Sequence, residues 1–327
     1  MNGLLAIFCI ALFSLTVPFT RLAALEAAPE AVTLLRLTGA GVICLVLALR
    51  DGWSPPKKIW LHLAVTSCGA VAGFSTLMAF AMRQVPGSHG AVALAALPAV
   101  TAVYASLRDR SNPGLIFWIF AIAGTALSFG YFFTSSVERL AVGDGLLGLA
   151  VISAAFGYVE GGRLSRLYGG RRVMSWAILL TLPVAIPLLV FLFSASDFKA
   201  GTLSLQAWLA LAYLALVSQS TGMFLWYKVL ARGPMEKIAL VQLLQPFLTL
   251  LASIIILQET VTWQAWLVAL LVVLCIFGAN NTGSRTKSTK VVELRTVRSE
   301  LPPVSETPQQ QPISNAVNQL KERRRVV

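Results

Sequence analysis

Long apolar runs without a charged residue recur along most of this sequence and limit what it can fold into. Several approach the ~20 residues that a helix needs to cross ~30 Å of hydrocarbon. Strands of a membrane barrel would alternate in segments of about ten residues, and these runs show no such alternation. Hydrophobic residues make up 57% of the chain and charged residues only 12%, against roughly 25% charged in a soluble domain. The sequence predicts an all-α integral membrane protein.

We expect ten transmembrane helices, five in each half of the chain. The sixth has a charge-free stretch of only 14 residues, so it must continue through Glu160 toward Arg163 to span the bilayer. The expected spans are Gly3 to Thr20, Ala31 to Leu49, Ile59 to Met82, Gly90 to Leu107, Leu115 to Phe133, Leu146 to Val159, Val173 to Ala195, Leu205 to Tyr227, Ile238 to Leu257 and Val261 to Ala279.

The distribution of Lys and Arg tests this topology independently. With the N-terminus in the cytoplasm, the cytoplasmic loops hold 12 of these residues and the opposite loops hold 4, as the positive-inside rule requires. The net charge of +12 is thus a topology signal and does not indicate a nucleic-acid partner. We expect a multi-pass protein of the cell (cytoplasmic or inner) membrane, with both termini cytoplasmic.

Two parts of the chain resemble each other. Residues 86–130 align without a gap on 234–278, an offset of 148. The matched pairs include Pro86 with Pro234, Pro98 with Pro246, Trp118 with Trp266, and Gly130 with Gly278. Because five spans are an odd number, the second half enters the membrane inverted relative to the first, the plan of many secondary transporters.

We therefore expect a first five-helix repeat over residues 1–138 and an inverted second repeat over 139–280. Residues 281–327 are rich in Ser, Thr, Gln, Pro and scattered charges, which predicts a disordered basic cytoplasmic tail. The end of that tail either is simply solvated or attracts anionic lipid head groups of the bilayer. A homodimer is compatible with this organisation.

Pro98 and Pro246 lie near the middle of the fourth and ninth spans, at repeat-related positions. Each removes a backbone hydrogen bond, so the helix bends or opens at membrane depth. Paired interruptions of this kind indicate a central binding site, although a packing kink is the alternative. Uncharged polar residues recur nearby at helical spacing and must face the protein interior, where they contact a substrate or bond neighbouring helices. These candidates are Thr101 and Tyr104 in the fourth span, Gln219 and Trp226 in the eighth, and Gln242, Gln245 and Thr249 in the ninth.

Two charged residues are candidates for transport chemistry. Arg36 lies inside the second span and could clamp a substrate carboxylate or phosphate; alternatively it reaches outward or pairs with Glu26 or Glu30. Glu160 is a candidate for proton coupling, although Arg163, three residues later, offers it an ordinary helix-surface partner.

Several motifs are absent from the sequence. No G-x-x-x-x-G-K-[ST] loop occurs, so the chain has no P-loop of its own to couple to ATP. There is no G-x-S-x-G or H-E-x-x-H motif, which disfavours an enzyme. The four cysteines fall inside apolar runs without metal-ligand spacing, so we expect no metal and no cofactor.

The sequence resembles the EamA-type branch of the drug/metabolite transporter superfamily over residues 1 to about 280. The resemblance rests on V-P-F-T-R-L-A (Val17 to Ala23) and T-L-L-R-L (Thr33 to Leu37), and more specifically on the second half. There it comprises W-Y-K-V-L-A-R-G-P (Trp226 to Pro234), L-L-Q-P-F-L-T-L-L-A (Leu243 to Ala252) and Q-E-T (Gln258 to Thr260). The first half departs from the family pattern at Arg108-Asp-Arg110, where the family often has Gly-Glu.

This resemblance implies a ten-helix transporter, an exporter more often than an importer, that moves small molecules such as amino acids or nucleobases by alternating access. Related four-helix multidrug exporters use a glutamate in their first span; the first span here has no acidic residue, which argues against export of lipophilic cations. Two alternatives stay open: a translocase for lipids or lipid-linked carriers, and a non-transport membrane adaptor acting through the basic tail.

Overall fold

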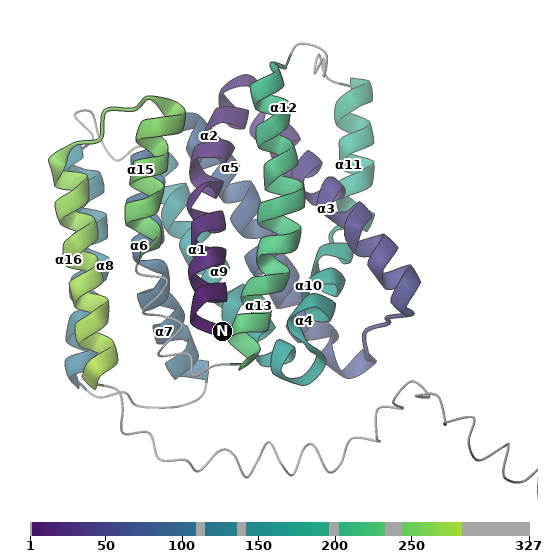
Figure 1. The fold of residues 1–327 in the computed structure, drawn as a ribbon, viewed down its shortest axis with the longest axis horizontal. Helices are drawn as coiled ribbons and strands as arrows, with labels where there is room; N and C mark the ends of the chain where they lie inside the picture. Colours follow the sequence, from purple (N-terminus) through teal and green to yellow (C-terminus); the bar gives the residue numbers. More distant parts are fainter. Residues whose placement is uncertain (1, 109–114, 136–141, 196–202, 233–243, 283–327) are drawn as a thin grey trace, which may run out of the picture. The chain divides into compact units, whose positions relative to one another are not determined.

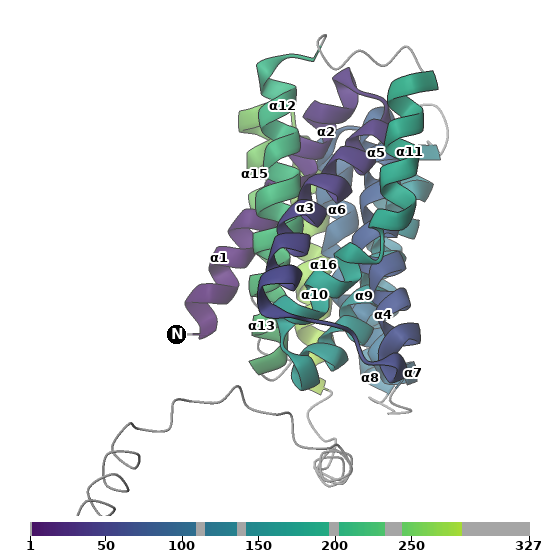
Figure 2. The same cartoon turned by 90° about the vertical axis from the view of Figure 1, so that its right-hand side faces the viewer.

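The computed structural model describes residues 2–108, 115–135, 142–195, 203–232 and 244–282. Within these ranges the backbone is helical apart from short connections, and no strand occurs there. The predicted all-α fold class is confirmed. Figures 1 and 2 show the helices running between the same two ends of a bundle, with the N-terminal part of α1 diverging from the others.

The first half contains three spans that are not simple α-helices. The first is divided at Leu15, and the third begins with a 3₁₀ turn and has a π-helical segment, η2, in its middle. The fourth is divided at Ala96, two residues before Pro98. The elements are α1 (Asn2–Ser14), α2 (Thr16–Glu26), α3 (Pro29–Asp51), η1 (Lys57–Ile59), α4 (Trp60–Thr66), η2 (Ser67–Gly73), α5 (Phe74–Gln84), α6 (Gly87–Ala95), α7 (Leu97–Arg108) and α8 (Leu115–Ser135).

The second half shows the same kind of interruptions. Helix α9 continues well past Glu160, as the sixth span requires, and a second π-helical segment, η4, lies within the eighth span. The elements are α9 (Val142–Tyr168), α10 (Gly170–Leu179), α11 (Leu182–Ala195), α12 (Leu205–Ala212), η4 (Tyr213–Gly222), α13 (Met223–Arg232), α15 (Gln245–Leu257) and α16 (Trp263–Thr282).

Six helical segments are long and apolar enough to cross a membrane, and α10 with α11, bent by 45°, forms a seventh if the pair is one span. Helices α8, α15 and α16 are further helices of the described residues. The expected ninth span begins at Ile238, outside the described residues. The six segments are Leu4–Glu26, Pro29–Asp51, Lys57–Gln84, Gly87–Arg108, Val142–Tyr168 and Leu205–Ala231.

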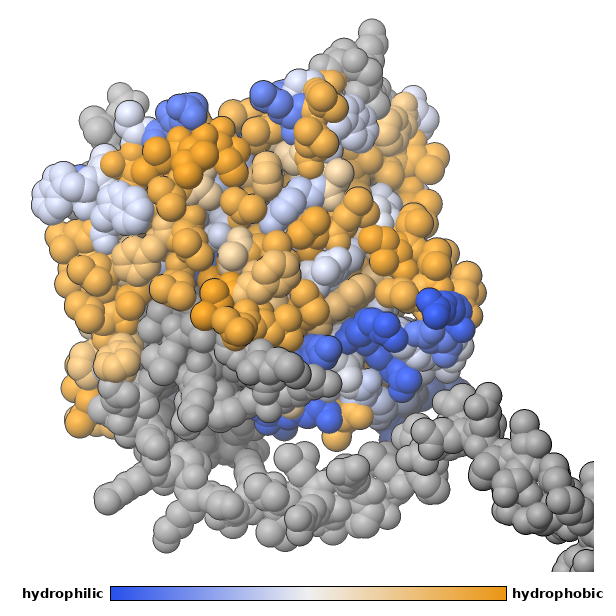
Figure 3. All heavy atoms as spheres, in the orientation of Figure 1, coloured by the Kyte–Doolittle hydropathy of each residue, from blue (hydrophilic) through white to orange (hydrophobic). Residues whose placement is uncertain are grey.

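Large apolar side chains are exposed along many of these helices, among them Leu49, Leu61 and Phe191. Figure 3 shows hydrophobic residues over most of one face, with hydrophilic residues gathered toward its two ends. A surface this apolar is suited to lipid rather than water. The protein is a multi-pass membrane protein.

Helix α9 is central to the packing, because it contacts α4, η2, α5, α7, α10 and α13. Small residues bring it close to η2. A Cβ atom added to Gly69 would lie 2.7 Å from the Gly157 amide nitrogen and from the Ser153 carbonyl oxygen. Close approach of this kind is how membrane helices gain van der Waals contact without a hydrophobic driving force.

The two π-helical segments lie at corresponding places in the two halves. Adding the sequence offset of 148 to Ser67–Gly73 gives residues 215–221, which fall inside η4. In η4 the Ser220 and Thr221 hydroxyls each donate to the carbonyl five residues earlier, at 2.7 and 3.0 Å. Such wide turns are rare and often occur at functional sites, because they turn side chains in directions that an α-helix does not reach.

Candidate functional site

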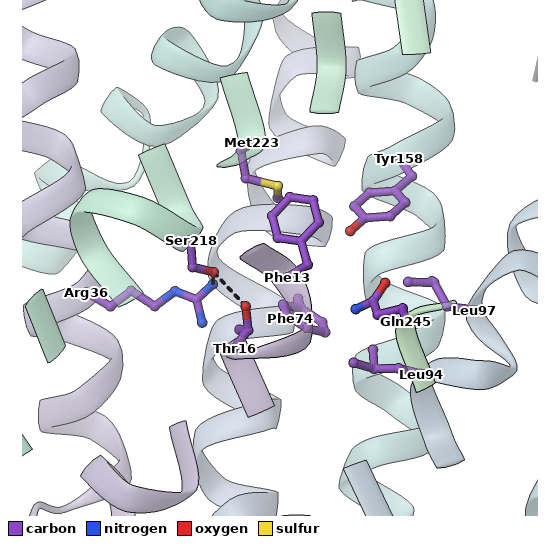
Figure 4. Close-up of a pocket in the computed structure, with 10 residues that line it drawn as sticks. All are labelled: Phe13, Thr16, Arg36, Phe74, Leu94, Leu97, Tyr158, Ser218, Met223 and Gln245. Atoms are coloured by element: carbon purple, nitrogen blue, oxygen red, sulfur yellow. Dashed lines mark hydrogen bonds between the residues drawn. The ribbon is translucent and has the colours of Figure 1, made fainter. Parts of the chain in front are cut away.

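A cavity lies between helices of both halves (Figure 4). Its empty volume is about 350 Å³ when the open space at its mouth is counted. The lining is mainly apolar, with a few polar groups that converge on it. The lining residues are Phe13, Thr16, Arg36, Phe74, Leu94, Leu97, Tyr158, Ser218, Met223 and Gln245.

Arg36 projects into this cavity from α3 and is only 3% exposed. Its Nε donates to Gln219 Oε1 at 2.9 Å, and its Nη2 donates to Ser218 Oγ at 3.3 Å. Both acceptors are uncharged and belong to η4. The sequence alternative of a pair with Glu26 or Glu30 is not what the structure shows.

The two acceptors are held in turn by the first half of the chain. Ser218 Oγ and Thr16 Oγ1 are 2.9 Å apart, and Ser75 Oγ donates to Gln219 Oε1 at 3.3 Å. One network therefore joins α2, α3, α5 and η4. Its members are all at most 4% exposed, so it fixes the guanidinium where solvent does not compete.

The opposite side of the cavity carries two further polar groups, the Gln245 amide and the Tyr158 hydroxyl (Figure 4). Gln245 begins α15 and Pro246 follows it in the first turn, where a missing N–H is tolerated. Proline thus places Gln245 at a helix start inside the protein. In Figure 4, Phe13, Phe74 and Met223 lie between Arg36 and this side.

Three candidate residues are buried but do not line the cavity. Trp226 packs edge-on against Phe13, with ring centroids 6.1 Å apart, and also contacts Tyr158. Thr249 is fully buried in α15. Pro98 follows the lining residue Leu97 at the start of α7. Of the three, Trp226 is the one with ring contacts to lining residues, Phe13 and Tyr158.

The other fourth-span candidates lie farther along α7. Tyr104 donates to Glu160 Oε1 at 3.2 Å, and Thr101 does not line the cavity. Gln242 lies outside the described residues.

Glu160, which is buried in α9, forms a cluster with partly exposed side chains near the C-terminal end of α7. Its side chain is 4% exposed. Arg108 Nε lies 2.8 Å from Oε1, and His62 Nδ1 lies 2.8 Å from Oε2. The cluster, which also includes Tyr104, ties α9 to α4 and α7.

Glu259 forms the matching contacts at the opposite end. It follows α15 and accepts hydrogen bonds from the Gly87 amide at 3.1 and 2.9 Å. Arg21 of α2 forms an ion pair with the same carboxylate at 3.4 Å. A carboxylate at the N-terminus of α6 is favourably placed for the helix dipole. Each end of the bundle thus has a glutamate of the second half bound to residues of the first.

Sequence reasoning missed most of the lining residues. Thr16, Tyr158 and Ser218 are the polar ones, and each lies in a span that is apolar or small on several faces, so no single face marks the inside. A buried pair, His89 Nδ1 to Asp144 Oδ1 at 2.7 Å, was likewise not expected. Among the described residues no three His, Cys, Asp or Glu side chains form a group that could hold a metal ion.

The sequence profile of the EamA-like transporter family matches the chain twice, over residues 1–135 and 141–281. The chain belongs to this family. It is accordingly a membrane transporter of a small molecule in a lipid bilayer, and the family resemblance read from the sequence is confirmed. Family membership points to a transporter rather than an enzyme.

One relative that is named a transporter supports the same placement. The EamA-family chain is 36% identical to the Bacillus subtilis protein named "Uncharacterized transporter YdeK", over 85% of this chain and 96% of that protein. It is 29% identical over 116 residues to a Thermoproteus tenax protein named for its place in a 23S RNA operon. A crystal structure of another protein superposes with a TM-score of 0.59 at 15% identity, covering 88% of this chain and 98% of that one, which shows a shared fold.

Proposed function

We propose that this EamA-family transporter is a secondary transporter that exports small polar metabolites, such as amino acids or nucleobases, by alternating access through the central cavity. The observation that carries the proposal is a cavity lined from both halves, in which Arg36, Gln245 and Tyr158 converge between apolar walls. Few, convergent polar groups in an apolar site are typical of small-molecule recognition. Export is the direction that the family resemblance favours.

The proposal includes ten spans in two inverted repeats, over residues 1–138 and 139–280. Three observations support it: the family profile matches twice, the π-helical segments overlap when the sequence offset of 148 is applied, and helices of repeat-related spans pack together. The packed pairs are α6 with α15 and α8 with α16. The Lys and Arg distribution supports an inner-membrane protein with cytoplasmic termini.

The glutamate contacts at the two ends suggest how access alternates. The Glu259 contacts join the halves at one end and the Glu160 cluster joins them at the other, with the cavity between. Separating one set while the other stays formed would open the cavity to one side of the membrane only. In one state the Glu259 contacts would be formed and the Glu160 cluster separated, and in the other state the reverse would hold.

Glu160 is also the candidate for proton coupling. Its carboxylate accepts three hydrogen bonds, including one from the Arg108 guanidinium. A proton on this carboxylate would remove the ion pair and weaken the cluster, so proton uptake and opening at this end would be linked.

Counterflow in proteoliposomes tests the proposal. The full chain is reconstituted, the vesicles are loaded with a mixture of unlabelled amino acids and nucleobases, and accumulation of each labelled compound is followed. We expect saturable accumulation that Gln245→Ala reduces, because this amide faces the cavity. Gln84→Ala is the matched control, since the Gln84 side chain is exposed and donates to the Phe80 carbonyl of its own helix.

Lack of counterflow by any of these compounds in a well-folded preparation would contradict the proposal. Counterflow of a labelled lipid instead would favour the lipid translocase. If Gln245→Ala and Gln84→Ala reduce counterflow equally, transport does not depend on this cavity.

A further inference from the structure

The guanidinium of Arg36 has no acidic partner among the residues that the structure describes. The carboxylates of that part of the chain which form ion pairs, Asp51, Asp144, Glu160 and Glu259, pair with other side chains. The Arg36 contacts are instead the neutral oxygens of Gln219 and Ser218. Within the described part of the chain, the positive charge is thus held by the neutral dipoles of these two side chains.

The third nitrogen of this guanidinium is the important one. Nη1 is buried and has no hydrogen-bond partner among the described residues, while Nε and Nη2 are both used. A buried, unpaired donor costs about 1–3 kcal/mol, and more when it is charged. A buried charge without a counter-ion costs several kcal/mol. Both costs are removed by one ligand group that is anionic and accepts hydrogen bonds.

We infer that Arg36 anchors a carboxylate of the transported molecule in the central cavity. This inference rests on the proposed function and narrows its substrates to organic carboxylates, zwitterions included, over neutral nucleobases. Guanidinium and carboxylate match in shape as well as charge, and charge-assisted hydrogen bonds between them are roughly twice as strong as neutral ones.

The rest of the cavity defines the remainder of the ligand. Arg36 is the one charged residue among the lining residues, so a monoanionic group balances the charge and a phosphate dianion does not. Phe13, Phe74 and Met223 offer apolar walls to a hydrocarbon or aromatic body. The Gln245 amide and the Tyr158 hydroxyl face Arg36 across the cavity (Figure 4) and can bond a second polar group.

The competing explanation is that Arg36 only ties α3 to η4 through Gln219 and Ser218. A purely structural arginine would leave ligand preference independent of charge. Matched ligands that differ only in the acid group separate the two explanations, and they do so in the unmodified protein.

The test uses the full chain, purified in detergent, with thermal unfolding as the readout of binding. The probes are benzoate with benzamide, L-leucine with L-leucinamide, phenyl phosphate and uracil. A ligand that binds the folded state raises the unfolding temperature with concentration, which yields a Kd without transport. We expect at least one carboxylate to bind about 10- to 100-fold more tightly than its amide, the range expected for one buried charge-assisted contact.

Variants then assign the effect to Arg36. Arg36→Gln should abolish the preference for the carboxylate while leaving the weak affinity for the amide. Arg36→Lys should keep part of the preference for the carboxylate. Arg83→Gln is the matched control, because Arg83 bonds backbone carbonyls of Ala24 and Ala27 outside the cavity. If Arg36→Gln does not fold, the ligand pairs in the unmodified chain still decide the question.

The inference would be overturned if each carboxylate bound with the same affinity as its amide, or if phenyl phosphate or uracil bound more tightly than the carboxylates. It would also be overturned if the preference for the carboxylate survived in Arg36→Gln, or if no carboxylate of the panel bound. Counterflow of a neutral compound in the proteoliposome assay would leave the proposed function standing while this inference fails; absence of all counterflow would remove the proposed function itself.

Discussion

Helix α9 approaches η2 so closely that Gly157 has no room for a side chain. A Cβ atom added there would lie 2.8 Å from Ala70 Cα and nearer still to the Ala70 amide nitrogen. Ordinary contact begins at 3.4 Å, so the two backbones would have to separate by at least 0.6 Å. The obstructing atoms are the Ala70 amide nitrogen, Cα and Cβ, none of which can rotate away as the end of a long side chain can.

Gly157→Ala should therefore destabilise the folded protein. Overpacking of this kind costs about 1–3 kcal/mol, and the better helix propensity of alanine returns only about 1 kcal/mol. Gly145→Ala is the matched control on the same helix, because nothing lies within 4 Å of its added Cβ. That control should be neutral or more stable by up to about 1 kcal/mol.

The displacement should also reach the cavity. Tyr227 donates to the Gly157 carbonyl at 2.9 Å, and Tyr158, the next residue, lines the cavity. We expect Gly157→Ala to lower both the unfolding temperature in detergent and the counterflow rate, and Gly145→Ala to lower neither. An unchanged unfolding temperature in Gly157→Ala would refute the reasoning, because it would mean that α9 and η2 can separate at no cost.

Two further predictions concern coupling and the tail. Glu160→Gln should keep counterflow, which needs no driving ion, but lose accumulation driven by a pH gradient, because the amide cannot gain or release a proton; equal accumulation in both proteins would remove Glu160 as the proton carrier. Deletion of residues 281–327 should leave the rate of counterflow unchanged when equal amounts of reconstituted protein are compared, whereas an adaptor acting through its tail would lose its cellular phenotype.

Much of the fold could be predicted because lipid leaves so few choices. Charge-free runs predict helices, and the sixth span had to pass Glu160, which α9 does. The bend between α10 and α11 was not predicted, although Pro183, at the start of α11, removes a backbone donor close to the break. The sequence carried that signal, but a hydropathy reading passes over it, since proline does not interrupt an apolar run.

The site was less accessible to sequence reasoning. Arg36 and Gln245 were singled out because a charge or an amide at membrane depth is costly unless it faces inward, and both line the cavity. Tyr104 was singled out for the same reason but bonds Glu160 instead. The polarity of a side chain predicts that it faces the protein interior, but it does not predict which interior group it contacts. Phe13 and Phe74, which also line the cavity, carry no such signal, because apolar residues suit lipid and cavity alike.

Arg36 and its hydrogen-bond partners are far apart in the sequence, which affects insertion of the chain during synthesis. Gln219 follows Arg36 by 183 residues, so at 5–20 residues per second the arginine waits about 9–37 s for that oxygen to be synthesised. During that time the second span must stay inserted with an unbonded guanidinium, at a cost of about 2.5–3.5 kcal/mol. Its segment has the highest mean hydropathy of the six long spans, which offsets that cost. Polar substitutions on the lipid side of α3 should therefore reduce the yield of inserted protein, even where the folded transporter would tolerate them.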